Sequence, residues 1–178
     1  SDVYKRQVVR ALNSLGASTK ILKKSKDFEN IDKLVFPGQG SMGACLKKLS
    51  ENDLRDALIF SLKNLPFLGI CLGLQILFSE SEESEDEKGL GIFPEKIKKF
   101  SEFKDRTIKI PHMGWNQVEF SQSHFIWEGL ESSKNFYFVH SYASKEIDEE
   151  YIYSKTFHGE SFNSAVAKDN IFATQFHP

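Results

Sequence analysis

The chain has 178 residues, of which 40% are hydrophobic and 27% charged, and this composition is ordinary for a globular protein with its own core. The net charge of −2 gives no electrostatic reason to expect nucleic acid as a partner. No apolar run approaches the ~20 residues that span a bilayer, and two cysteines do not suggest a disulfide framework. We therefore expect one domain, residues 1–178, in the cytoplasm, with no membrane partner.

The first part of the chain alternates helical and strand patterns. Residues 8–15 carry apolar side chains at helical spacing, and Gly16 follows as a C-terminal cap. Further along we expect strands at 19–22, 33–36 and 67–70, and helices at 41–50, 53–63 and directly after Cys71. Short apolar strands that alternate with helices predict an α/β fold with a doubly wound, mostly parallel sheet.

The second part has a β pattern. Residues 80–87 carry six acidic side chains, which we interpret as a solvated surface loop. From about residue 90 onward we expect strands at 96–100, 107–110, 116–120, 135–143, 163–167 and 171–176. These strands predict an antiparallel extension of the same sheet.

Both ends of the sequence depart from this pattern. Residues 1–7 show no strand or cap signal, and we interpret them as an artefact of sequencing or cloning. A doubly wound fold normally opens with a strand, so we expect an N-terminal strand to be missing. We also expect a C-terminal tail to be missing after Pro178.

The segment Gly69–Gly73 has the form G-x-C-x-G between a strand and a helix. A nucleophile on such a sharp turn is exposed, because the two glycines remove Cβ atoms that would collide with the neighbouring strand and helix. The helix N-terminus favours a thiolate on Cys71, and the Leu72 N–H is placed to face an oxyanion. A buried structural cysteine is the alternative. Cys45 lies in a helical stretch without such glycines, and we interpret it as packing.

A cysteine that attacks an amide needs a base that can also protonate the leaving group, and histidine does both near neutral pH. The chain has five histidines: His112, His124, His140, His158 and His177. His177 ends an apolar strand, where sites form in open α/β sheets. His124 and His158 lie in polar stretches, and His112 and His140 fit loop or binding roles. A structural role for His177 stays open.

Together these residues resemble a known family. The segments LGICLGLQ (68–75) and ATQFHP (173–178) are similar to those of class I glutamine amidotransferases, which have a flavodoxin-like fold. Four further segments are similar to the amidotransferase subunits of imidazole glycerol phosphate synthases. They are FPGQGSMGACL (36–46), GLGIFPEKIKKF (89–100), IPHMGWNQV (110–118) and FYFVHSYA (136–143).

The resemblance assigns roles to individual residues. It implies that Cys71 is the nucleophile and His177 the general acid and base, with the triad glutamate expected after Pro178. Oxyanion and glutamine contacts are implied for Gly38, Gln39, Gly40, Leu72, Gln75, Ser141 and Tyr142. A partner interface is implied for Met113, Gly114, Trp115 and Asn116. No metal or cofactor is implied.

The resemblance also implies an activity, which is hydrolysis of L-glutamine to glutamate and ammonia. The ammonia would pass to a (β/α)8-barrel cyclase subunit, which makes imidazole glycerol phosphate and an aminoimidazole carboxamide ribotide in histidine biosynthesis. One alternative is an amidotransferase subunit that serves anthranilate or aminodeoxychorismate synthesis. Two more are a cysteine hydrolase of the α/β-hydrolase type and a catalytically impaired partner-binding subunit.

Overall fold

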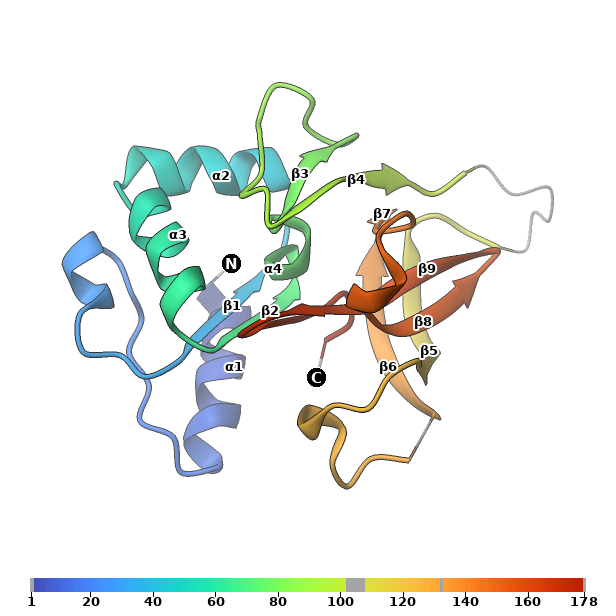
Figure 1. Ribbon diagram of the computed structural model, residues 1–178, viewed down its shortest axis with the longest axis horizontal. Helices are drawn as coiled ribbons and strands as arrows, with labels where there is room; N and C mark the ends of the chain where they lie inside the picture. The colour runs from blue at the N-terminus through green and yellow to red at the C-terminus, as the bar shows by residue number, and fades with distance from the viewer. Residues whose placement is uncertain (1, 102–107, 132, 178) are drawn as a thin grey trace.

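The computed structural model describes residues 2–101, 108–131 and 133–177, and Figure 1 shows how its elements are arranged. Helices gather around three parallel strands at one end of the molecule, and antiparallel strands form the other end. Within the described ranges, no helix is long and apolar enough to cross a membrane.

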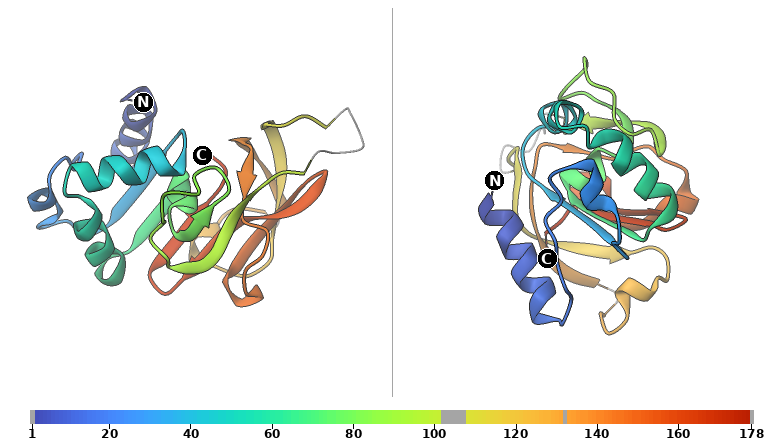
Figure 2. Two further views of the ribbon diagram at one scale, coloured as in Figure 1. Left: turned by 90° about the horizontal axis from the view of Figure 1, so that it is seen from above. Right: turned by 90° about the vertical axis from the view of Figure 1, so that its left-hand side faces the viewer.

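The parallel part of the main sheet contains the strands β1 (Leu34–Gly38), β2 (Phe67–Cys71) and β10 (Ile171–Thr174). Helix α1 (Asp2–Ser14) lies on one side of these strands, and α2 (Met42–Glu51) and α3 (Arg55–Asn64) lie on the other (Figures 1 and 2). The short α4 (Leu72–Gln75) follows β2 directly. Since β2 lies between β1 and β10, its carboxyl end is at the centre of this layer.

The antiparallel part continues the same sheet from β10. Seven strands follow one another in the order β1-β2-β10-β9-β8-β5-β6. The added strands are β9 (Glu160–Lys168), β8 (Ile152–His158), β5 (His112–Phe120) and β6 (Ser133–His140). A smaller sheet contains β3 (Phe78–Ser81), β4 (Phe93–Lys99) and β7 (Tyr142–Ala143). The predicted α/β fold with an antiparallel β extension is therefore confirmed, and its sheet is mixed.

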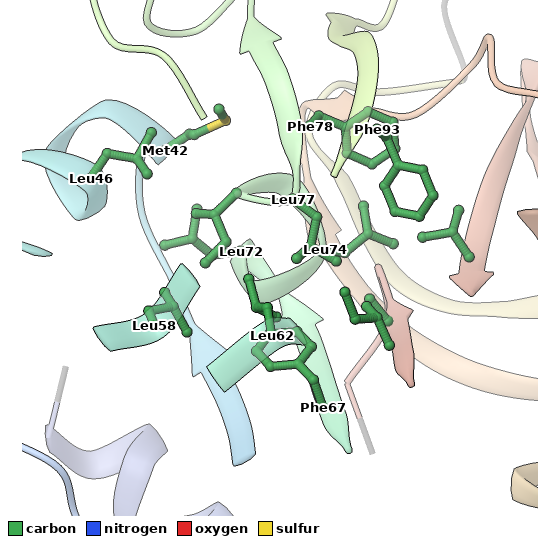
Figure 3. Packing of buried hydrophobic residues seen from close by; sticks show 14 of the residues in the cluster. Met42, Leu46, Leu58, Leu62, Phe67, Leu72, Leu74, Leu77, Phe78 and Phe93 are labelled. Carbon is green, nitrogen blue, oxygen red and sulfur yellow. The ribbon is translucent and has the colours of Figure 1, made fainter. Parts of the chain in front are cut away.

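Two clusters of buried side chains hold these layers together. The first packs leucines of α2, α3 and α4 against the parallel strands and against Phe78 and Phe93 (Figure 3). The second is rich in phenylalanine and lies among the antiparallel strands; it includes Phe100, Phe138, Phe162, Phe172 and Phe176. Burial of a large apolar side chain stabilises the fold by about 1.5–3 kcal/mol. The two clusters therefore hold the loops between them in position.

Several expected elements have different bounds. The helix predicted at 8–15 begins at Asp2, so residues 2–7 belong to it. The strand predicted at 19–22 is wrong, because these residues pair with no strand in the described part of the chain. The helix after Cys71 ends at Gln75, since the chain turns at residues 76–77 to let Phe78 begin β3 beside β4. Residues 108–110 form no strand, and residue 107 lies outside the described residues.

The acidic segment 80–87 is more than a solvated loop. The backbone N–H of Met42 donates to the Glu83 carboxylate at 3.0 Å, and that of Gly43 donates to the Ser84 hydroxyl at 3.1 Å. Ser81 is buried at the end of β3. The segment therefore satisfies backbone N–H groups at the start of α2, which a helix cannot satisfy internally.

Candidate active site

Cys71 occupies the sharp turn between β2 and α4. Its backbone has φ +56° and ψ −103°, a conformation that residues other than glycine rarely adopt. The chain reverses here within one residue, because β2 ends at Cys71 and α4 begins at Leu72. The strained turn that the sequence predicts for the nucleophile is therefore present.

The flanking glycines are required by close backbone contacts. A Cβ atom on Gly69 would lie 2.5 Å from the carbonyl oxygen of Gly73. A Cβ atom on Gly73 would lie 2.0 Å from the carbonyl oxygen of Phe36 in β1. Both distances are below any real Cβ contact, so only glycine permits this approach.

The Cys71 thiol is buried, and its surroundings set its protonation. Burial raises the pKa of the Cys71 thiol to about 12, against the lowering effect of hydrogen bonds from the Leu72 N–H and the Gln175 side chain. The sequence predicted that a helix N-terminus would favour a thiolate on Cys71, but the helix that follows, α4, has only four residues. At neutral pH the group is a thiol, so attack on an amide requires a base to take its proton.

His177 follows the strand next to β2. Strands β10 and β2 are parallel with Thr174 opposite Ile70, so their carboxyl ends meet at one edge of the sheet. The His177 backbone N–H donates to the Tyr137 carbonyl at 2.9 Å and holds this end of the chain against β6. Burial lowers the pKa of the His177 imidazole, which keeps it neutral and able to accept a proton at pH 7.

Gln175 is a site residue that the sequence analysis missed. Its side-chain N–H donates to the Cys71 sulfur at 3.5 Å, and its side-chain oxygen accepts from Gln75 at 3.2 Å. Gln75 also donates to the Tyr142 carbonyl at 3.2 Å, which joins two of the predicted glutamine-contacting residues. Strand β10 ends at Thr174 and residues 175–176 form bends, so strand alternation could not have indicated Gln175.

The predicted oxyanion loop lies beside the elbow. Gly38 is opposite Cys71 in the parallel register of β1 and β2, and a Cβ atom on Gly38 would touch Leu72 at 3.0 Å. Gly40 has φ +95°, which favours glycine, and Gln39 is exposed. The loop and the Leu72 N–H therefore come from neighbouring strand ends.

The remaining predicted residues lie elsewhere on the sheet. Ser141 connects β6 to β7, and its carbonyl accepts from the Phe100 N–H. Met113 and Trp115 on β5 have exposed fractions of 62% and 72%. With Gly114 and Asn116 they line a hollow that the exposed Phe157 of β8 also borders. The structure thus places the predicted interface residues on one surface.

Neither His112 nor His140, for which loop or binding roles fit the sequence, lies in a loop. His112 and His140 are buried in β5 and β6, and His124 and His158 are half-buried. Among the described residues, no group of three or more His, Cys, Asp or Glu side chains could hold a metal ion.

The chain is similar to known proteins over nearly all of its length. The family model described as "Glutamine amidotransferase class-I" matches residues 1–178. The imidazole glycerol phosphate synthase subunit HisH of Hydrogenovibrio crunogenus is 42% identical over 158 residues, which cover 89% of this chain and 74% of that protein. The subunit HisH of Nitrosomonas europaea is 43% identical over 181 residues, covering 97% and 84%.

Solved structures agree on the fold. A crystal structure of a glutamine amidotransferase superimposes with a TM-score of 0.74 at 20% identity, over 97% of this chain and 84% of that one. A glutamine amidotransferase from Thermotoga maritima gives a TM-score of 0.61 at 15% identity, over 96% of this chain and 68% of that one.

Proposed function

Because the chain belongs to the class I glutamine amidotransferases, we propose that Cys71 and His177 carry out its glutaminase reaction. The chain is the glutamine-hydrolysing subunit of an imidazole glycerol phosphate synthase, a function that its HisH relatives indicate. The observation that carries the catalytic assignment is the strained elbow that presents Cys71 beside the Leu72 N–H.

In the first half of the reaction, His177 takes the proton of the Cys71 thiol and the sulfur attacks the side-chain amide carbon of glutamine. Negative charge then develops on the amide oxygen. The Leu72 N–H and the Gly38–Gln39 peptide N–H stabilise this oxyanion by hydrogen bonds. His177 next gives its proton to the leaving nitrogen, which departs as ammonia and leaves a thioester on Cys71.

In the second half, water attacks the thioester and His177 takes the proton of the water. The carbon–sulfur bond breaks, glutamate leaves, and His177 returns its proton to the sulfur, which restores the thiol of Cys71 and the neutral imidazole. Gln75, Ser141 and Tyr142 hold the glutamine during both halves, since the Tyr142 carbonyl and the Gln75 amide lie in one network with the nucleophile. The reaction needs no cofactor.

The ammonia requires a second subunit that consumes it, and the relatives are named as subunits of a synthase. The proposed partner is a (β/α)8-barrel cyclase that binds the surface around Met113, Gly114, Trp115 and Asn116. Exposed aromatic side chains such as Trp115 and Phe157 support this assignment, because large aromatic groups are enriched at protein interfaces. Both proteins would act in the cytoplasm.

A steady-state glutaminase assay, with and without the cyclase subunit, tests the catalytic assignment. Cys71→Ser should lower turnover by about 10⁴-fold or more, as loss of a covalent nucleophile does. Cys45→Ser is the matched control, since Cys45 lies on α2 and has no place in the mechanism. Activity of Cys71→Ser above a few per cent of the parent chain would exclude the assignment.

A further inference from the structure

A continuous chain of buried and partly buried hydrogen bonds joins the nucleophile to a pair of histidines in the antiparallel half of the sheet. From Cys71 it passes through Gln175 and Gln75 to the Tyr142 carbonyl. From that carbonyl it continues through His140 and His112 to Asn116. Gln175, Gln75, His140 and His112 have exposed fractions of 0%, 6%, 6% and 3%, so these four side chains are shielded from bulk water.

The Tyr142 carbonyl sets the direction of every bond, because a carbonyl oxygen only accepts. The Gln75 side chain must turn its N–H groups toward this oxygen and toward Gln175. Gln175 must therefore present its oxygen to Gln75, which leaves its own N–H groups facing the Cys71 sulfur. With Gln175 turned over, two N–H donors would meet and an oxygen would face the sulfur.

The same carbonyl sets the histidine tautomers on its other side. His140 Nδ1 lies 2.9 Å from the Tyr142 oxygen and therefore carries the proton. Burial lowers the pKa of His140 to about 4 and that of His112 to about 3, so both rings are neutral at pH 7. His140 Nε2 then accepts from His112 Nδ1 at 3.0 Å, and His112 Nε2 accepts from the Asn116 amide at 3.1 Å.

Aromatic packing holds the two rings in place. His112 lies between Phe138 and His158, with ring centroids 4.6 Å and 4.0 Å away and planes nearly parallel. His140 packs against Phe100 and Phe162. Neither ring can turn without breaking these contacts, so the bond from His140 to the Tyr142 carbonyl is held in one geometry.

We propose that Gln175 stabilises the thiolate of Cys71 through an N–H donor whose direction is fixed by the Tyr142 carbonyl, and that His140 is a positioning residue for that carbonyl. A donor aimed at the sulfur favours the charged form that attacks glutamine. The assignment deepens the proposed glutaminase function and rests on it, and it gives the His112–His140 pair a role outside the Cys71–His177 pair.

The direct test changes the donor into an acceptor with little change of shape. In Gln175→Glu, a carboxylate oxygen replaces the N–H group at the sulfur. The readout is the rate of Cys71 alkylation by iodoacetamide divided by that of Cys45 in the same chain, measured by peptide mass spectrometry. A hydrogen bond to a charged group is typically worth about tenfold or more in an equilibrium, so the ratio should fall by at least that factor.

Gln122→Glu is the matched control. Gln122 is another glutamine with a hydrogen-bonded side-chain amide, which donates to the backbone carbonyls of Glu149, Glu150 and Ile152, and it lies outside this network. Its replacement should lower the melting temperature and leave the alkylation ratio unchanged. Should Gln175→Glu fail to fold, Gln175→Met removes the donor without adding charge and should lower the ratio in the same direction.

Two substitutions of His140 test the positioning role. The side-chain amide of Asn can replace the Nδ1 donor, so His140→Asn should keep the ratio within about threefold of the parent chain. His140→Leu cannot donate, and the loss of a neutral hydrogen bond should lower the ratio by roughly threefold to tenfold. Equal ratios for Asn and Leu at this position would overturn the role of His140.

Glutamine kinetics separate this inference from the proposed function. Gln175→Glu should lower kcat in parallel with the alkylation ratio and change KM little, because Gln175 acts on the nucleophile. An unchanged ratio in folded Gln175→Glu, or a raised KM at unchanged kcat, would overturn the inference while leaving the Cys71–His177 assignment intact. An active Cys71→Ser variant would instead reject the proposed function, and the alkylation ratio would still report on Gln175.

Discussion

Gly73→Ala is the substitution whose effect the geometry of the elbow determines most directly. The new Cβ atom would lie 2.0 Å from the Phe36 carbonyl oxygen and 3.2 Å from its carbon. Both atoms belong to the backbone of β1, which cannot move without breaking its pairing with β2. Alanine is otherwise well tolerated in the first turn of a helix, so the expected loss of stability comes from the steric clash. Overpacking of this kind costs about 3 kcal/mol, or roughly 6–12 °C in melting temperature for a chain of this size.

Calorimetry or a fluorescence melt measures this shift, and Gly129→Ala is the control. Gly129 has φ +78° and open space around its Cα, so alanine there meets backbone strain without a clash. A residue other than glycine in that region costs about 1–2 kcal/mol, which is about 2–8 °C. If Gly73→Ala melted within about 2 °C of the parent chain, the close contact of the elbow with β1 would be refuted.

Three further predictions concern other parts of the chain. Glu83→Ala should lower the melting temperature by about 2–4 °C through loss of a helix cap on α2, with turnover unchanged, whereas the exposed Glu85→Ala should change neither. The pKa values of His140 and His112 are depressed in the folded state, so below about pH 6.5 the unfolded state binds more protons than the folded state. The free energy of unfolding should therefore be highest above that pH and should fall as the pH drops toward 4. At pH 5 each histidine should lower the free energy of unfolding by about 2 kcal/mol. Urea titrations should show a smaller fall in this free energy for His140→Asn. Trp115→Ala should weaken binding of the cyclase subunit by calorimetry without lowering the melting temperature, and an unchanged affinity would place the interface elsewhere.

The elbow could be predicted from sequence because its determinants are local. Two glycines, a nucleophile and the change from an apolar strand to a helix all lie within Gly69–Gly73, and the structure has that turn. The two strands beside the site were also predicted as apolar runs, although β10 ends at Thr174 and not at residue 176. Sites in open α/β sheets form at the carboxyl ends of the strands. This rule predicted which residues lie at one edge of the sheet.

Strand β8 was not predicted from the sequence because two of its three buried side chains, Ser154 and Thr156, are polar. Ser154 and Thr156 point into the core and satisfy each other through Ser164, with hydrogen bonds of 2.9 Å. No alternation of apolar and polar residues marks such a strand. The opposite error occurred at residues 19–22, where a short apolar pattern has no strand beside it in the described residues to complete its backbone hydrogen bonds.

The polar network around Cys71 could not be predicted from the sequence for a different reason. Gln175 and Gln75 are a hundred residues apart in sequence, and an amide has no charge or metal-binding pattern that singles it out. The placement of His112 beside His140 depends on the antiparallel register of β5 and β6, which pairs these two residues. Register of this kind depends on which strands are neighbours, and the sequence alone did not define that order.

Covalent labelling by a glutamine-like electrophile tests whether Cys71 is the nucleophile of a glutaminase. The folded chain is incubated with a chloroketone analogue of glutamine, and its peptides are mapped by mass spectrometry with glutamine as competitor. We predict one adduct on Cys71, suppressed by glutamine, and no adduct on Cys45. An adduct on Cys45 in place of Cys71, or labelling of Cys71 that glutamine does not suppress, would show that Cys71 is not the nucleophile.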